Sequence, residues 1–450
     1  MFETLKNVFR VKEMRRKLLY LIWMIFIIRI GCQIPVPGVD SDFFKQWFSS
    51  NAGDAFNFFD AFTGGSFERM SIFALNITPY ITSSIIIQLL TIAIPALEEM
   101  QRDGEEGRKK MTAITRYVTV GLALFESIAM AIGFGRQGMI PNLNFFKGVV
   151  VVACLTAGSA MLMWLGERIT EKGVGNGISI VLTINIISRV PSDLSLLYEN
   201  FIKGKTIAKG TLAGLIIAAV ILVVVVLVLI LNGAERRIPV QYSKKMVGRK
   251  LMGGQSTNIP LKVNTAGVIP VIFASSIMSF PTVIAQLTGK GNGTGIGSEI
   301  LRGLSSNNWC NPKQLQYTWG LLLYIVLCVF FAYFYTSITF NPLEVADNIK
   351  KQGGFIPGIR PGKPTVDYLT KILNYIIFIG ACGLVIVQVI PFFFNGVFGA
   401  QVSFGGTSLI IIIGVVLETV KQIESQMLVR NYTGFLNNKG NAMKNSFLGF

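Results

Sequence analysis

The side chains that most often carry out catalysis are sparse in this sequence. It contains no histidine, which excludes histidine-based triads, metal sites and proton relays. The five cysteines are scattered, without the CxxC spacing of a metal or redox site. The run Gly204-Lys205-Thr206 lacks the earlier glycine that a phosphate-binding loop needs, because that position is Glu199. We therefore expect a protein that is not an enzyme and that binds no metal and no cofactor.

Two ionisable residues, Arg29 and Glu126, lie within apolar segments. Charged side chains inside a membrane are functional candidates by default, and both types occur in proton-coupled transport. The alternative is structural, either a polar contact between helices or an Arg29 side chain that reaches the membrane surface. One glutamate and one arginine without further relay residues favour the structural alternative.

Uncharged polar side chains are concentrated on two other apolar segments. The first runs from Asn76 to Gln88 and the second from Asn264 to Pro281. Polar groups inside a bilayer need partners or water, so both segments are candidates for lining a water-filled path. Close helix packing is the alternative, because serine, threonine and glycine also favour it.

The apolar segments that carry these side chains are long enough to cross a membrane. The chain has 450 residues, of which 51% are hydrophobic and only 14% charged. Uncharged runs include 28 residues between Arg69 and Glu98 and 30 between Lys313 and Glu344, whereas a spanning helix needs about 20. The stretch 372–417 is broken near Pro391 and counts as two spans. With weaker spans at about 18–34, 117–135 and 173–188, the sequence predicts an all-α polytopic membrane protein with ten transmembrane helices.

The basic residues are distributed unevenly about these spans. The formal net charge is +17, and 29 of the 41 lysines and arginines fall on segments that are cytoplasmic if the N-terminus is inside. This is the positive-inside pattern, although the segment 190–210 carries three lysines on the other side. Arg29 interrupts the first apolar run and no small-residue cleavage site follows, which predicts a retained first helix. Both termini are therefore expected in the cytoplasm.

Ten spans divide into two halves of five, and an odd number of spans per half places the halves in opposite orientations. Inverted halves are a common way to build a gated path across a membrane. We expect an N-terminal half at 1–190, a hinge segment at 191–210, a C-terminal half at 211–430 and a cytoplasmic tail at 431–450. Two long basic cytoplasmic loops, 235–262 and 341–371, suggest docking to an acidic partner such as ribosomal RNA or an acidic protein face.

Motifs along nearly the whole chain resemble the SecY family, the central subunit of the bacterial protein translocase. The matching motifs, in chain order, are Arg29-Ile30-Gly31, Ile34-Pro35-Val36-Pro37-Gly38, Phe62-Thr63-Gly64-Gly65, Ser71-Ile72-Phe73-Ala74-Leu75, Ser84-Ile85-Ile86-Ile87-Gln88-Leu89-Leu90-Thr91, Met163-Trp164-Leu165-Gly166-Glu167, Gly175-Asn176-Gly177-Ile178-Ser179, Pro260-Leu261-Lys262-Val263-Asn264, Gly267-Val268-Ile269-Pro270, Phe355-Ile356-Pro357-Gly358-Ile359-Arg360-Pro361-Gly362 and Phe404-Gly405-Gly406-Thr407-Ser408. Their order and number make the resemblance specific.

The resemblance implies an hourglass pore between the two halves, closed at its waist by a ring of apolar side chains. By position the ring consists of Ile77, Ile81, Ile178, Leu182, Ile272 and Ile411. Leu182 replaces the isoleucine usual in the family. A narrow apolar ring dewets and so blocks ions, while it imposes no chemical preference on a passing chain. For each side chain taken alone, ordinary packing is the alternative.

The resemblance also implies a plug, a lateral gate and docking sites. The plug is a short helix at about 54–67 that includes Phe56, Phe59, Phe62, Gly64 and Gly65. Its aromatic side chains are alternatively an interfacial anchor. The gate candidates are Gln88, Asn264 and Ser275, and the candidates for docking a motor or ribosome are Arg249, Lys250 and Arg360.

The implied function is a channel that translocates unfolded secretory polypeptides and releases membrane-protein helices into the bacterial plasma membrane. The implied partners are the SecE and SecG subunits, the SecA ATPase, the ribosome, signal-sequence-bearing polypeptides and membrane lipid, and a homodimer of the complex is left open. The main alternative is a secondary transporter of a small solute, which would need a charged or ion-binding site near the membrane midplane. A membrane enzyme would need clustered catalytic groups at one interface.

Overall fold

The protein is represented by a computed structural model and forms two compact units. The N-terminal unit comprises Met1–Ala52, Phe59–Arg189 and Gly414–Phe450, and the C-terminal unit comprises Gly53–Phe58 and Val190–Ile413. Within these ranges the structure describes all residues except 1–10, 52–59, 61, 137, 139, 141–143, 204–206, 243–244, 248–249, 253–255, 288–295, 306–307, 313, 399–405 and 448–450.

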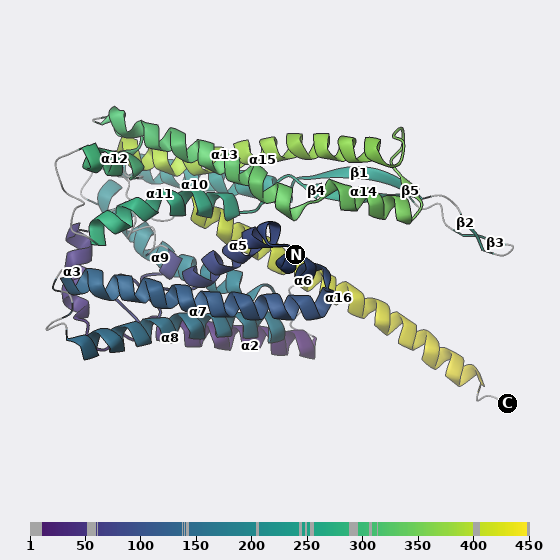
Figure 1. The fold of residues 1–450 in the computed structure, drawn as a ribbon, viewed down its shortest axis with the longest axis horizontal. Coiled ribbons are helices and arrows are strands. Elements are labelled where there is room, and N and C mark those ends of the chain that lie inside the picture. The colour runs from purple at the N-terminus through teal and green to yellow at the C-terminus, as the bar shows by residue number, and fades with distance from the viewer. Residues whose placement is uncertain are drawn as a thin grey trace. The chain divides into compact units, whose positions relative to one another are not determined.

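The N-terminal unit is helical. Its helices are α2 (Lys12–Gly31), α3 (Ser41–Asn51), α5 (Thr78–Ala93), α6 (Pro95–Arg102), α7 (Gly104–Arg136), α8 (Phe145–Lys172) and the first part of α9 (Gly177–Phe201). Proline at the first positions of α5 and α6 suits helix starts, because those amides have no partner within the helix. The Asn144 side chain caps α8 by accepting from the amide of Phe145. Helices α7 and α8 lie side by side (Figure 1).

The C-terminal unit combines helices with a small sheet. Its helices are α10 (Ile207–Gly233), α11 (Ile269–Leu287), α12 (Ile296–Leu304), α13 (Trp319–Thr339), α14 (Pro342–Lys351), α15 (Lys363–Phe398) and the start of α16 (Gly406–Phe447). A short 3-10 turn, Leu315–Thr318, precedes α13. Helix α13 packs against both α11 and α15. The Asn341 side chain caps α14 by accepting from the amide of Leu343.

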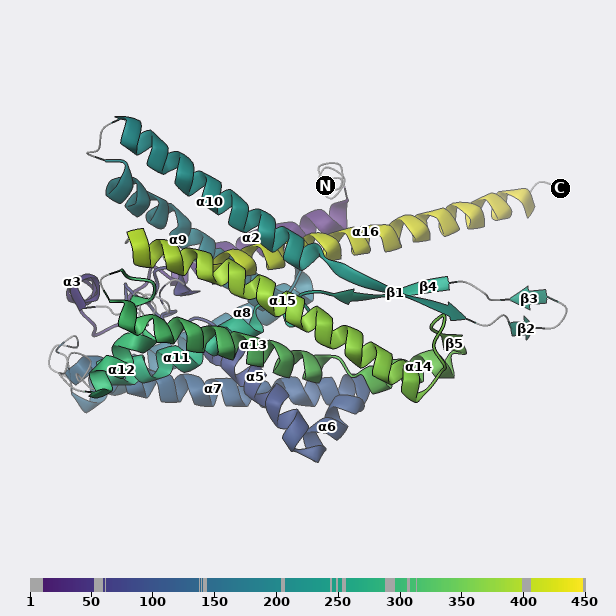
Figure 2. The same cartoon turned by 90° about the horizontal axis from the view of Figure 1, so that it is seen from above.

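The basic loop expected at 235–262 is a β-ribbon. Strands β1 (Glu235–Tyr242) and β4 (Ser256–Lys262) pair antiparallel, with β2 (Lys245–Val247) and β3 (Lys250–Met252) further along the ribbon (Figure 2). The short strand β5 (Gly354–Phe355) adds to β1 and completes the sheet order β4-β1-β5. The all-α expectation therefore holds for the membrane part but omits this sheet.

The sheet is held to the helices by a small core. Ile238 and Val240 are buried on alternate positions of β1, so that one face of the strand is apolar. They share this core with Ala346 and Ile349 of α14 and with Leu369 of α15. The two loops predicted to be separate basic protrusions thus share one sheet and one core.

Helices lie where the sequence predicts spans. Among the described residues, six helices are long and apolar enough to cross a membrane, or seven if the bent pair α5 and α6 counts as one span. The predicted hinge at 191–210 differs most from the structure. Helix α9 continues through Pro191 to Phe201, and α10 already begins at Ile207.

The continuation of α9 has a physical cause in its packing. Leu197 is buried, and Phe201, Ile217 and Ile221 pack against it. The last turns of α9 therefore contribute to the core of the C-terminal unit together with α10, and the segment is a helical extension with a short connection.

Gly158 of α8 gives a test of the packing in the N-terminal unit. A Cβ atom at Gly158 would collide with the backbone carbonyl of Ile72, which precedes α5. We expect Gly158→Ala to lower the stability of the unit by about 1–3 kcal/mol, because a backbone carbonyl cannot rotate away as a side chain can. Gly148→Ala is the matched control on the same helix, since a Cβ there meets nothing within 4 Å. Thermal unfolding in detergent should show a lower Tm only for Gly158→Ala, and equal values would contradict the packing described here.

Candidate functional site

Three of the predicted pore-ring residues gather in the N-terminal unit. Ile77, immediately before α5, is fully buried in a cluster that includes Leu165 of α8. Ile81, one turn further along α5, and Ile178 at the start of α9 are half-buried and pack against that cluster. Positions four residues apart share a helix face, so α5 presents Ile77 and Ile81 together.

The other ring candidates are placed on the expected elements. Leu182 is buried on α9, one turn after Ile178. In the C-terminal unit, Ile272 is half-buried on α11 and Ile411 is buried on α16. Closure of a ring by all six side chains stays a prediction.

The described part of the predicted plug is the end of a helix, at Phe62 and Thr63, followed by a compact turn. Phe56 and Phe59 lie outside the described residues. The amides of Gly64 and Gly65 donate to the Asp60 carbonyl at 3.0 and 3.4 Å, and both glycines have positive φ, +67° and +82°. Gly64 is also tightly packed, because a Cβ there would lie 2.5 Å from the Asn185 carbonyl oxygen of α9. Glycine at 64 is therefore required by backbone conformation and by space.

A chain of polar contacts joins this turn to the surrounding helices. The Asn76 side chain donates to the carbonyl of Phe62 at 2.6 Å, and the Asn185 side chain donates to the Asn76 side-chain oxygen at 3.0 Å. The Arg29 guanidinium of α2 donates to the Asn185 side-chain oxygen at 3.3 Å. Arg29 thus makes the interhelical polar contact that was one of its two interpretations.

The sequence reasoning missed Asn185 and the ion pair between Arg189 of α9 and Asp60. A signal was present for Arg189, because it directly follows the uncharged run 173–188, where an uncompensated charge is unfavourable. Glu126 lies half-buried on α7.

The gate candidates lie on the expected elements in each unit. Gln88 is exposed on α5 of the N-terminal unit. In the C-terminal unit, the Asn264 side chain donates to the Asn232 side-chain oxygen of α10 at 2.8 Å. Ser275 of α11 is half-buried beside Tyr324 of α13. Their joint role as a gate stays a prediction.

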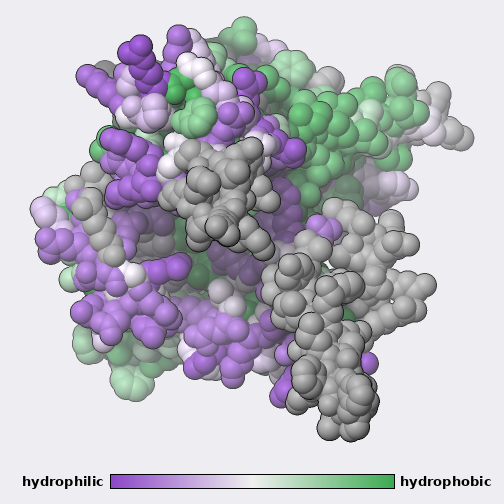
Figure 3. Space-filling view, turned by 90° about the vertical axis from the view of Figure 1, so that its right-hand side faces the viewer, coloured by the Kyte–Doolittle hydropathy of each residue, from purple (hydrophilic) through white to green (hydrophobic). Residues whose placement is uncertain are grey.

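The docking candidates lie on the sheet and the turn that follows it. Arg249 lies outside the described residues, and Lys250 is the first residue of β3. Arg360 is exposed between β5 and α15, and its backbone carbonyl accepts from the Thr365 hydroxyl at 2.9 Å. Gly358 and Gly362 on either side have positive φ, which fixes the shape of this turn. Hydrophilic side chains gather over α14 and this turn at the upper left of Figure 3.

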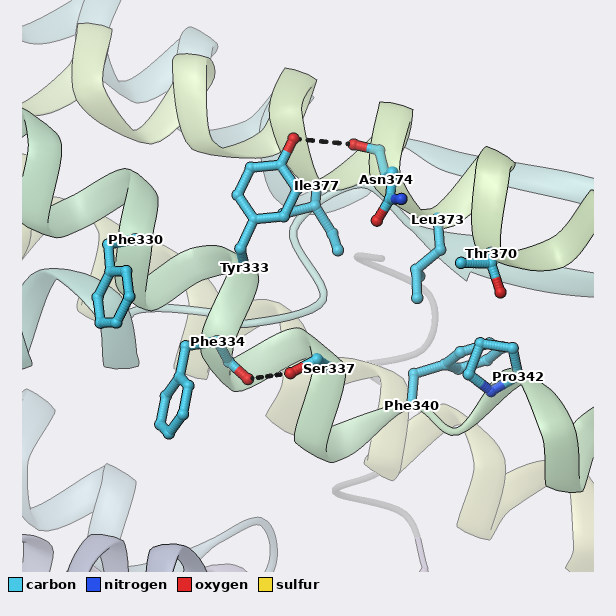
Figure 4. A pocket seen from close by; sticks show the side chains of 10 residues that line it. All are labelled: Phe330, Tyr333, Phe334, Ser337, Phe340, Pro342, Thr370, Leu373, Asn374 and Ile377. Atoms are coloured by element: carbon cyan, nitrogen blue, oxygen red, sulfur yellow. Dashed lines mark hydrogen bonds between the residues drawn. The ribbon is translucent and has the colours of Figure 1, made fainter. Parts of the chain in front are cut away.

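A pocket of about 470 Å³ lies between α13, the start of α14 and α15 (Figure 4). It is lined by Phe330, Tyr333, Phe334, Ser337, Phe340, Pro342, Thr370, Leu373, Asn374 and Ile377. The Tyr333 hydroxyl bridges the two helices by donating to the Asn374 carbonyl at 3.3 Å. This lining carries no charged side chain. The described residues also contain no cluster of three acidic, cysteine or histidine side chains that could hold a metal.

Comparisons with known proteins agree on one family. A family model described as SecY matches residues 71–420. A relative from Streptomyces galbus, described as protein translocase subunit SecY, is 44% identical over 97% of this chain and 100% of its own length. A relative of the same description from Halalkalibacterium halodurans is 42% identical, again over 97% of this chain and 100% of its own length.

Solved structures share the fold at low sequence identity. One, described as a protein-conducting channel, has a TM-score of 0.62 at 17% identity and covers 92% of both chains. A second, described as a SecY protein whose plug domain stabilises the closed channel, has a TM-score of 0.59 at 18% identity and the same coverage. A third, Sec61 in a canine ribosome-channel complex, has a TM-score of 0.58 at 16% identity and covers 92% of both chains. These likenesses show that the chain has the channel fold.

Proposed function

Because the chain belongs to the SecY family and is therefore a protein translocase channel subunit, we propose that it carries unfolded secretory polypeptides across the plasma membrane and releases hydrophobic helices sideways into the bilayer. One observation supports this most directly. The turn after Asp60 is hydrogen-bonded to Asn76, the residue next to the ring candidate Ile77. In this proposal the turn belongs to a removable plug and Ile77 to an apolar constriction, so that the plug is anchored beside the constriction, as a sealed polypeptide channel needs.

The proposed path lies between two halves, 1–190 and 211–430, which enclose an hourglass pore with its waist at the six ring candidates. Both termini are proposed to be cytoplasmic, on the ground of the 29 basic residues assigned to that side. Gln88, Asn264 and Ser275 are proposed to line the lateral gate. An amide or hydroxyl there can exchange its protein partner for water as the gate opens, at a smaller penalty than a charge would incur.

The proposed partners are SecE, SecG, the SecA motor and the ribosome. The basic loop segments support this, because clustered positive charge favours acidic partners and ribosomal RNA. The structural relative Sec61 is described in a ribosome complex. Energy is proposed to come from these partners, and the chain itself supplies the path.

Reconstitution tests the proposal. The chain would be placed in liposomes with SecE and SecG, and SecA, ATP and an unfolded secretory precursor would be added. We expect precursor to become protected from external protease only when both SecA and ATP are present. An intact complex that never protects precursor, together with saturable uptake of one defined solute by the chain alone, would instead establish the small-solute transporter.

A further inference from the structure

The most deeply buried charge among the described residues of the N-terminal unit is Asp60, which begins the described part of the plug turn. Its relative exposure is 0%, and its partner Arg189 retains a side-chain exposure of only 17%. One carboxylate oxygen of Asp60 accepts from the Glu68 amide at 2.9 Å and from the Thr63 hydroxyl at 3.4 Å. The other carboxylate oxygen faces the Arg189 guanidinium. Asp60 therefore closes its own turn and connects it to α9.

A buried carboxylate and a buried guanidinium stabilise each other only while they remain together. Removal of one partner leaves an uncompensated charge in a poorly solvated site, and the penalty for that is large. Moving the turn away from α9 separates the same two charges. The ion pair consequently opposes displacement of the turn from α9. An apolar contact of similar area would allow the turn to slide along the helix.

Other residues on the same face of α9 also hold the turn. Asn185, Ser188 and Arg189 are spaced at i, i+3 and i+4, which places them on one side of the helix. The Ser188 hydroxyl donates to the Asn185 carbonyl at 2.7 Å and approaches the Gly64 carbonyl at 3.4 Å. Asn185 contacts Asn76, which in turn binds the carbonyl of Phe62. The turn 60–67 is thus bound to one helix by an ion pair and by a polar chain.

We propose that Asp60 and Arg189 are positioning residues that latch the plug turn to α9 and keep the resting channel sealed. This inference rests on the proposed function, because it assigns the turn to the plug. It identifies α9 as the element whose movement relative to the turn releases the seal. It also gives Arg189, a charge in the middle of a long apolar helix, a definite role.

The test compares leak with stability in the complex of the full chain with SecE and SecG in liposomes. The measured quantities are the efflux of a trapped small anion from resting channels, the Tm of the complex and SecA-driven translocation. The variants are Asp60→Asn, Arg189→Gln, the double variant and the conservative Arg189→Lys. Glu167→Gln is the control, because it breaks a partly exposed ion pair of the same unit with Arg116.

Each single neutralisation should raise resting leak by about tenfold or more and lower the Tm, since each breaks the buried ion pair between Asp60 and Arg189. Arg189→Lys should leak much less than Arg189→Gln. The double variant separates the roles, because neither charge of the Asp60–Arg189 pair is then left facing a neutral partner, and its Tm should rise above those of the single variants. A latch predicts that its leak stays high, whereas a purely structural role predicts that leak recovers with Tm.

Several results would overturn the latch. They are unchanged leak in both single variants, leak that follows Tm throughout the series, and leak from Glu167→Gln equal to that of Asp60→Asn. Should the single variants fail to assemble, the double variant and Ser188→Ala would decide by the same comparison, because Ser188→Ala removes the hydroxyl that approaches the Gly64 carbonyl and involves no charge. Translocation is measured separately from leak. If the unaltered complex does not translocate precursor, the proposed function itself is rejected.

Discussion

Replacing Arg360 by glutamate is expected to abolish motor-driven translocation while leaving the complex folded. The Arg360 side chain is exposed, and the hydrogen bond described for this residue uses its backbone carbonyl, which any side chain retains. Substitutions at such positions change stability by about 0.5 kcal/mol or less. A reversed charge in a docking surface costs several kcal/mol through contact between like charges. We therefore expect the rate of translocation to fall about a hundredfold.

The measurement is the amount of protease-protected precursor per minute, with SecA and ATP, for Arg360→Glu against the unaltered chain. Lys363→Glu is the matched control three residues away, because Lys363 is exposed on the first turn of α15, where an acidic residue is tolerated. A large loss confined to Arg360→Glu would support its role. Equal losses would indicate a general charge effect, and translocation that survives Arg360→Glu would remove the role altogether.

Replacing Ile81 and Ile178 by serine is expected to make the resting channel conduct ions. Both side chains are half-buried and pack at the edge of the cluster around Ile77. An apolar constriction excludes water and hence ions, and a hydroxyl at the same place can hydrogen-bond water. The ion conductance should rise by roughly tenfold for each 1.4 kcal/mol by which the free-energy barrier to ion passage through the constriction falls.

The control keeps apolar volume at the same positions. Ile81→Leu with Ile178→Leu should conduct as little as the unaltered channel, because leucine fills a similar space without a polar group. Single-channel recording in planar bilayers measures both variants, and the Tm of each complex shows whether folding was affected. A seal that persists in the double serine variant would place the constriction elsewhere.

The membrane part of the fold was predictable because run length and charge are local properties of the sequence. The uncharged run that ends at Glu98, for example, contains α5. The length of α9 was not predictable in the same way: the uncharged run stops at Arg189, whereas α9 continues to Phe201, and Asp60 pairs with Arg189 from more than a hundred residues away. A pairing of this kind depends on tertiary structure and leaves no periodic signal.

The sheet was missed for a different reason. The alternation of Ile238 and Val240 in β1 has the period of a strand, but it covers too few residues to stand out beside the charges around it. Of the site, the family resemblance assigns Ile77, Ile81 and Ile178 to the pore ring, which stays a prediction; the structure shows that these three side chains pack in one cluster. The contact between Arg29 and Asn185 could not be predicted, because a polar residue in a span has many potential partners.

The pairing of β5 with β1 has a mechanical consequence. Gln241 of the ribbon is paired with Phe355, only a few residues before Arg360, and Leu369 of α15 belongs to the same core as Ile238. A force applied at either loop would therefore be shared by both loops and transmitted to the start of α15 through the shared sheet and core. The ribbon and the Arg360 turn therefore form one connected unit, so that two partners bound at different loops would act on the same helix.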